Sequence, residues 1–155
     1  SWTTQRGMDG FPFSPLLLAA RLWTVSGDLL GPNGESEPGK WTILEDPWSQ
    51  TIALLDDVEK LQRAPVLRTI ESKSDNWLTE DRLNEELAKV IEQRRRGKYG
   101  ETTHSGAVRS MLLQKWALNF DRANIRHVKI LIPGWAIHLE TEQILHGRNG
   151  RLYDD

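Results

Sequence analysis

The first helix signal of the chain is "FSPLLLAARLW", residues 13–23. Ser14 is a good helix cap, Pro15 suits the first helical position, and no helix-breaking residue follows before Trp23. These features predict a short helix. Because nearly all of its side chains are apolar, we expect this helix to be buried in the core of the protein.

Three further helices are predicted along the chain. The second begins at the cap Asp46 and runs to about Arg63, with apolar residues repeating at helical spacing. The third is the best marked: Thr79 caps it, acidic residues occupy its first turn, and Gly97 is expected to end it in a left-handed conformation. The fourth, about residues 106–120, scatters its polar side chains around the helix, which is typical of a helix packed on several sides.

Other segments lack helix signals. Residues 26–39 hold four glycines and two prolines, so we expect a mobile loop there. Directly after it, "KWTILE", residues 40–45, has strand character. Residues 64–72 are predicted to be extended, because Pro65 interrupts any helix and β-branched residues follow it.

A hairpin is predicted in "RHVKILIPGWAIHLE", residues 126–140. A two-residue turn at Pro133-Gly134 would place alternate residues of the two strands on opposite faces. The apolar face would consist of Val128, Ile130, Ile132, Trp135, Ile137 and Leu139. The polar face would hold His127, His138 and Glu140. Two imidazoles and a carboxylate are able to bind zinc or iron, but we expect a solvated cross-strand pair here and no transition-metal site.

Together these elements predict a single α+β domain over residues 1–155, with four helices followed by a C-terminal antiparallel hairpin or small sheet. Asn149-Gly150 lies between short apolar pieces and predicts one more hairpin, with a type I′ turn. From Trp48 to Glu140 the order of elements resembles that of a winged helix, whose third helix would enter the major groove of DNA. Winged helices also occur as protein-binding modules, so the order does not decide between these functions.

The composition limits the class of protein. The 155 residues carry a formal net charge of −2 and include no cysteine, which excludes a disulfide scaffold and thiolate metal sites. No apolar run approaches the roughly 18 residues of a membrane span, and the N-terminus lacks the pattern of a signal peptide. We therefore expect a soluble, intracellular protein with no membrane partner. The seven tryptophans are expected to serve mainly in core packing.

Charge is distributed unevenly along the chain. Residues 28–81 hold 12 acidic and 5 basic side chains, whereas residues 82–129 hold 11 basic and 5 acidic ones. The densest positive run ends the third predicted helix, where the partial negative charge of the helix end stabilises arginines. We prefer this structural role for the run. As a nucleic-acid site, the basic sector would instead use Arg94, Arg95, Arg96, Lys98, Arg109 and Lys115.

One short segment suggests a nuclease. "VLRTIESK", residues 66–73, resembles the Glu-x-Lys strand of metal-dependent nucleases of the PD-(D/E)xK type. The resemblance covers only these few residues. It implies that Glu71 and an upstream aspartate hold Mg²⁺ and that Lys73 supports the attacking water. The upstream candidates are Asp46, Asp56 and Asp57.

No other catalytic pattern is present in the sequence. There is no Gly-x-Ser-x-Gly turn, no phosphate-binding loop and no dinucleotide glycine motif. We therefore predict a non-catalytic interaction or assembly module, part of a larger protein or complex, that needs no cofactor and binds a protein partner or a second copy of itself. Nucleic-acid binding through the basic sector 82–129 is the first alternative, and a metal-dependent nuclease is the second.

Overall fold

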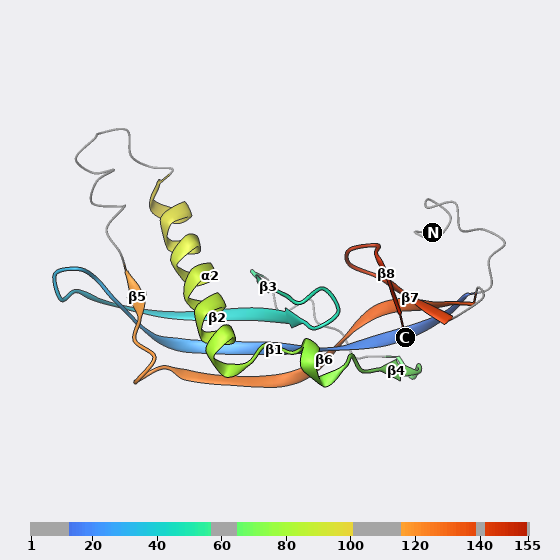
Figure 1. Ribbon diagram of the computed structural model, residues 1–155. Helices are drawn as coiled ribbons and strands as arrows, with labels where there is room; N and C mark the ends of the chain where they lie inside the picture. Colours follow the sequence, from blue (N-terminus) through green and yellow to red (C-terminus); the bar gives the residue numbers. More distant parts are fainter. Residues whose placement is uncertain (1–12, 57–64, 101–115, 139–141, 155) are drawn as a thin grey trace.

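The computed structural model describes residues 13–56, 65–100, 116–138 and 142–154. This part of the chain forms a curled, mostly antiparallel sheet with one α-helix lying across it (Figure 1). The elements in chain order are β1 (Phe13–Leu30), β2 (Ser36–Asp46), β3 (Thr51–Leu54), β4 (Thr69–Ile70), a short 3-10 helix η1 (Ser74–Asn76), α2 (Glu80–Gly100), β5 (Ala117–Leu118), β6 (Asn124–His138), β7 (Glu142–His146) and β8 (Leu152–Asp154). The predicted α+β fold of four helices and a hairpin is therefore wrong, and so is the winged-helix order.

The long strand β1 is the centre of the sheet, whose order is β3-β2-β1-β6-β7-β8. Along one edge of β1, residues 21–30 pair with β2, and Leu17 and Leu18 pair with β4 in parallel. Along the other edge, residues 13–26 pair with β6, and the last two residues pair with β5. Every other strand of the sheet is therefore positioned by β1, directly or through a neighbour.

The helix predicted at residues 13–23 is wrong because both faces of β1 are covered. Leu16 and Leu18 point to one face of the sheet, while Val25 and Leu29, at odd-numbered positions, point to the other. A strand buried on both faces has a continuous apolar run, which periodicity alone does not distinguish from a buried helix. Pro15 is tolerated because odd-numbered residues of β1 direct their N–H groups away from β6, as the bond from Leu17 N to Arg68 O shows.

The second predicted helix, residues 46–63, is also wrong. β2 ends at Asp46, whose Oδ1 accepts hydrogen bonds from the backbone N–H groups of Trp48 at 2.9 Å and Ser49 at 3.4 Å. This Asx turn reverses the chain through Gln50, which has a φ of 57°, into β3. The Asp-Pro pair that is able to start a helix thus starts a turn. Residues 57–64 lie outside the described part.

The third predicted helix is confirmed as α2. The backbone oxygen of Thr79 accepts the N–H of Leu83 at 2.8 Å, and its hydroxyl lies 3.4 Å from the N–H of Arg82. The apolar stripe Leu83, Leu87 and Ile91 is buried against the sheet. The predicted end is wrong, because the helix continues through Gly97 to Gly100.

The hairpin predicted around Pro133-Gly134 is wrong, since β6 runs straight through both residues. A Cβ at Gly134 would lie only 3.0 Å from the backbone oxygen of Leu145, so glycine allows β7 to approach closely. The predicted apolar face is also broken, because Val128 is 60% exposed. The second predicted hairpin is confirmed between β7 and β8, where Gly150 has a φ of 71° and donates its N–H to the oxygen of His146. Its predicted type I′ turn is wrong, because that turn needs a positive φ at Asn149 as well, and among the described residues other than glycine only Gln50 has one.

Three remaining predictions have mixed outcomes. The strand at residues 40–45 is confirmed as part of β2. The loop predicted at residues 26–39 is wrong in extent, because β1 continues to Leu30, β2 begins at Ser36, and only the turn between them is free of strand. Most of the fourth predicted helix, residues 106–120, lies outside the described part, but its end forms the short strand β5.

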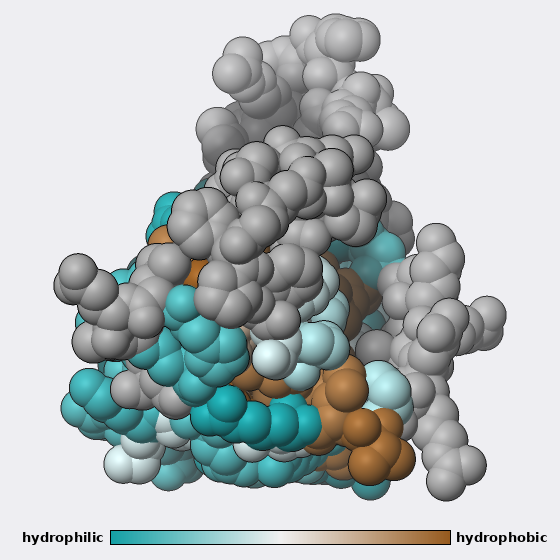
Figure 2. All heavy atoms as spheres, turned by 90° about the vertical axis from the view of Figure 1, so that its right-hand side faces the viewer, coloured by the Kyte–Doolittle hydropathy of each residue, from teal (hydrophilic) through white to brown (hydrophobic). Residues whose placement is uncertain are grey.

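Two apolar cores lie on opposite faces of the sheet. The helix-side core joins α2 to the sheet and contains Val25, Leu29, Ile43, Leu83, Leu87, Ile91 and Leu118. The far-side core contains Leu16, Leu18, Ala20, Leu44, Trp48, Ile70, Ile132, Ala136 and Ile144. Figure 2 shows an apolar patch bordered by hydrophilic side chains at the end of the sheet that carries β7 and β8. No helix in the described ranges is both long and apolar enough to span a bilayer.

Candidate interaction site

The longest open sheet edge among the described residues belongs to β6. One edge of β6 pairs with β1 over residues 124–137, whereas the other pairs with β7 only over residues 134–138. Residues 124–133 therefore have a partner strand on one side only, within the ranges that the structure covers. In Figure 1 this half of β6 forms the lower border of the sheet. An open edge carries backbone donors and acceptors that another strand is able to pair with.

The register shows which residues direct these groups outward. In an antiparallel ladder, the N–H and C=O of one residue point to the same side, and successive residues alternate. Gly147 donates its N–H to the oxygen of Pro133 at 2.9 Å, so odd-numbered residues of β6 face the outer edge. The register with β1 is unbroken from residue 124 to 137, which extends this rule along the strand. The outward-facing residues are Ile125, His127, Lys129 and Leu131.

Exposed basic side chains follow the same edge. Arg126 and Lys129 are solvent-exposed cations, and because neighbours on a strand alternate, Arg126 lies on the face opposite Lys129 and the exposed His127. The His127 ring is 4.4 Å from the Trp23 ring, which lies directly across the strand pair. A strand added to this edge would therefore meet positive charge on both faces of the sheet.

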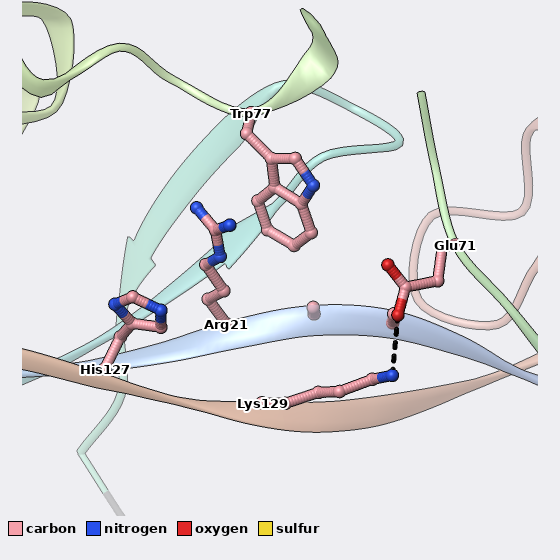
Figure 3. Close-up of a pocket in the computed structure, with 7 residues that line it drawn as sticks. Arg21, Glu71, Trp77, His127 and Lys129 are labelled. Atoms are coloured by element: carbon pink, nitrogen blue, oxygen red, sulfur yellow. Dashed lines mark hydrogen bonds and ion pairs between the residues drawn. The ribbon is translucent and has the colours of Figure 1, made fainter. Parts of the chain in front are cut away.

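A pocket of about 320 Å³ opens beside the outward-facing residues, on the face that carries α2. It is lined by Ala19, Ala20, Arg21, Glu71, Trp77, His127 and Lys129. Figure 3 shows Arg21 extending from β1 toward Trp77 and Lys129 extending from β6 toward Glu71. The Arg21 guanidinium lies 4.0 Å from the centre of the Trp77 ring, which is a cation–π contact. Two cations, one carboxylate and one indole are thus among the side chains that line the pocket.

A buried carboxylate holds this wall of the pocket in place. Glu45 is only 1% exposed and accepts two hydrogen bonds, from the indole N–H of Trp23 at 2.9 Å and from the backbone N–H of Leu78 at 2.8 Å. Because Leu78 follows Trp77 and Trp23 contacts His127, Glu45 fixes two aromatic side chains that contact the pocket residues. A buried carboxylate that is hydrogen-bonded in this way restricts local motion.

The arginines predicted as a nucleic-acid site are each paired with an acid. Arg94 contacts Asp56 at 2.6 Å, Arg95 contacts Glu37 at 2.8 Å, and Arg96 contacts Glu92 at 3.5 Å. Arg95 also lies 3.8 Å from the centre of the Trp116 ring. Lys98 is in α2, but its side chain is outside the described part, as are Arg109 and Lys115. The described arginines are thus held by intramolecular contacts.

We expect Arg95→Gln to destabilise the protein more than Arg94→Gln. The Arg95 side chain is 16% exposed and has both an ion pair and a cation–π contact, whereas Arg94 is 46% exposed and its partner Asp56 is 73% exposed. Arg95→Gln should lower the free energy of unfolding by about 1–2 kcal/mol. Arg94→Gln should lower it by less than about 0.5 kcal/mol. Urea unfolding of the two variants measures the difference; equal losses would contradict the assigned contacts.

The residues predicted for a nuclease do not converge in the described structure. Glu71 contacts Lys129, Asp56 contacts Arg94, and Asp46 is buried beside His146. Asp57 lies outside the described residues, and Lys73 is exposed just before η1. Within the described ranges, no group of three or more histidine or carboxylate side chains is placed to hold a metal ion.

The histidines of the predicted hairpin are separated as well. His127 and His138 stand at odd and even positions of one unbroken strand, so they point to opposite faces of the sheet. His138 instead contacts Glu142 at 3.4 Å, and Glu140 lies outside the described residues. The hairpin register that would have brought the two imidazoles together is therefore wrong.

A buried Asp–His pair lies on the far side of the sheet. His146 is fully buried, and its Nδ1 accepts the backbone N–H groups of Arg148 and Asn149. Its Nε2 lies 2.7 Å from Oδ2 of Asp46, in a bent rather than linear contact. Because both ring nitrogens are engaged and the ring has no access to solvent, this pair is structural rather than a general base.

Comparison of the chain with protein-family models, with curated proteins and with solved structures finds no match. Function must therefore be inferred from the geometry of the open edge and its pocket. Sequence reasoning missed Arg21 and Trp77 as site residues. The available signal was the basic stretch at residues 126–129, but its partners depend on a strand register that was not predicted.

Proposed function

We propose that this chain is a non-catalytic interaction module that binds an extended segment of a protein partner as an additional strand on β6. The observation that carries the proposal is the open edge at residues 124–133, where four residues direct both backbone groups outward. Main-chain hydrogen bonds provide affinity in this mode of binding, and pockets beside the edge provide specificity.

The charge of the edge favours an acidic partner over a second copy of β6. Centring an antiparallel self-pairing on Lys129 would place the Lys129 side chains of the two copies opposite each other, and like charges directly opposite each other are destabilising. Cations on an open edge are also a common protection against self-pairing. The same cations attract an acidic strand, so they oppose self-association and favour the proposed partner.

Nucleic-acid binding through the basic sector 82–129 is supported less well. Arg94, Arg95 and Arg96 each have an acidic partner within the chain. Arg95 is the most strongly held of the three, because its side chain is only 16% exposed and stacks on Trp116. Among the described residues, the helix α2 that carries these arginines also offers no open row of backbone groups like that of β6.

In the free chain, we expect amide hydrogen exchange along β6 to alternate. The N–H groups of residues 125, 127, 129 and 131 should exchange at least about tenfold faster than those of residues 126, 128 and 130, a factor that corresponds to about 1.4 kcal/mol. The slow group should be bonded to β1, as the register requires. Residue-resolved exchange measured by NMR tests this pattern, and uniform protection would show that the outer edge is already covered.

A peptide titration tests the function itself. The probe is an acetylated decapeptide of alternating threonine and glutamate, in which the threonines supply strand propensity and the glutamates place acidic side chains on one face. Its binding should slow exchange at the outward amides and leave the inward ones unchanged. Binding without protection of the outward amides, or no binding, would overturn the proposal. Tight binding of DNA or RNA with a steep dependence on salt would instead favour the nucleic-acid alternative.

A further inference from the structure

We infer that the pocket between β1 and β6 is a carboxylate-binding subsite in which Glu71 stands in for an acidic side chain of the partner strand. This inference rests on the proposed function and names the side chain that the partner should carry. Its basis is the arrangement of Arg21, Lys129, Glu71 and Trp77 around one pocket.

The sheet places two cations directly opposite each other. Arg21 and Lys129 are partners in the β1–β6 register, and the alternation derived above makes this a non-hydrogen-bonded pair, in which side chains are closest. Like charges in such a pair repel and destabilise the sheet. An anion between or beside the two cations offsets their repulsion. The Arg21–Lys129 pair therefore favours a bound carboxylate.

Glu71 shows that a carboxylate fits this position. Its Oε1 lies 2.6 Å from Nζ of Lys129. The hydrogen bond from Lys129, together with the positive charges of Lys129 and Arg21, lowers the pKa of Glu71 below its ordinary value. The Arg21 guanidinium also stacks on the Trp77 ring, 4.0 Å from its centre. Glu71 therefore contacts one cation of the pair, Lys129, and lies close enough to the other, Arg21, to feel its charge.

Glu71 is not fixed strongly in this position. The Lys129 and Glu71 side chains are 57% and 62% exposed, and exposed ion pairs contribute little to stability. Glu71 follows β4, whose two residues pair with β1 only at Leu17 and Leu18. The neighbouring Ile70 is part of the far-side core, but only the exposed side chain of Glu71 has to move for an incoming carboxylate to replace it.

The geometry of strand addition brings a partner side chain to this pocket. Lys129 directs its backbone groups to the outer edge and its side chain to the pocket face. A strand paired with Lys129 would place alternate side chains on that same face, next to the Lys129 ammonium. A glutamate at one of these positions would reach the Lys129 ammonium that Glu71 now contacts.

The test compares two peptides on matched variants of the full chain. The probes are the threonine–glutamate decapeptide and its threonine–glutamine counterpart. Glu71→Gln should tighten binding of the glutamate peptide about two- to fivefold, because a competing carboxylate is removed. Binding of the glutamine peptide should not change. Lys129→Gln should abolish the preference for glutamate, and Glu85→Gln on α2, which makes the same charge change outside the pocket, should leave it unaltered.

Each outcome separates this inference from the proposed function. If both peptides protect the outward β6 amides equally and Glu71→Gln changes neither affinity, the carboxylate subsite is wrong and strand addition stands. If neither peptide protects those amides, strand addition is wrong and the inference falls with it. If Glu85→Gln tightens binding as much as Glu71→Gln, the effect is one of net charge, and the subsite is again overturned.

Discussion

Val128→Pro is expected to lower the free energy of unfolding by about 3 kcal/mol or more, whereas His127→Pro should leave the fold intact. The two residues are neighbours and both are exposed, so burial does not predict a difference. The difference follows from the register: Val128 pairs with Leu22 at an inward-facing position, and His127 faces the open edge. Proline at residue 128 removes a bond within the sheet, while proline at residue 127 removes an N–H that faces outward.

Alanine at the same positions supplies the control for this comparison. Val128→Ala and His127→Ala remove the side chains but keep both N–H groups, so both should unfold close to wild type in urea. Pro133 shows that an outward-facing position of β6 tolerates proline in the native strand. Equal destabilisation by the two proline variants would refute the assigned alternation. His127→Pro should also weaken binding of the threonine–glutamate peptide more than His127→Ala does.

The sequence predicted the parts of the fold that depend on local signals. α2 combines a cap, a charged first turn and a regular apolar stripe, and each of these acts within a few residues. The turn at Asn149-Gly150 requires a positive φ that glycine supplies, so it too is local. Both were found because no distant contact competes with them.

The sheet could not be predicted because its strands depend on long-range pairing. Residues 13–23 carry helix start signals, but neighbours on both edges and cores on both faces override them. Pro133-Gly134 resembles a turn, yet Gly134 allows β7 to approach closely within an unbroken ladder. Tertiary packing decides both cases.

The candidate site depends on the same missing register. The cations of residues 126–129 are visible in the sequence, but Arg21 lies more than a hundred residues away and was placed in a helix. Only the pairing of Arg21 with Lys129 brings the two charges to one pocket. A register shifted by one residue would move every side chain of the strand to the other face and remove the site.

Asp46→Ala is expected to lower the free energy of unfolding by about 2–4 kcal/mol at neutral pH. The Asp46 carboxylate accepts backbone N–H groups of Trp48 and Ser49 and contacts the fully buried His146. Alanine would leave these donors without an acceptor, at about 1–3 kcal/mol for each buried group. Ser49→Ala, which changes a neighbouring residue of the same turn and keeps the carboxylate, is the matched control and should cost less than about 1 kcal/mol.

The loss caused by Asp46→Ala should depend on pH in a defined direction. Burial raises the pKa of Asp46, but the hydrogen bond and charge of His146 and the bonds from Trp48 and Ser49 outweigh it, so the pKa lies below its ordinary value of 3.8. The folded state then binds fewer protons than the unfolded state. This contribution is therefore fully present above pH 3.8 and is lost as the pH falls through the lowered folded pKa. Urea unfolding of wild type and Asp46→Ala between neutral pH and about pH 3 should show the two stabilities converging as acid is added. A constant difference over that range would show that Asp46 does not stabilise the fold through its charged form.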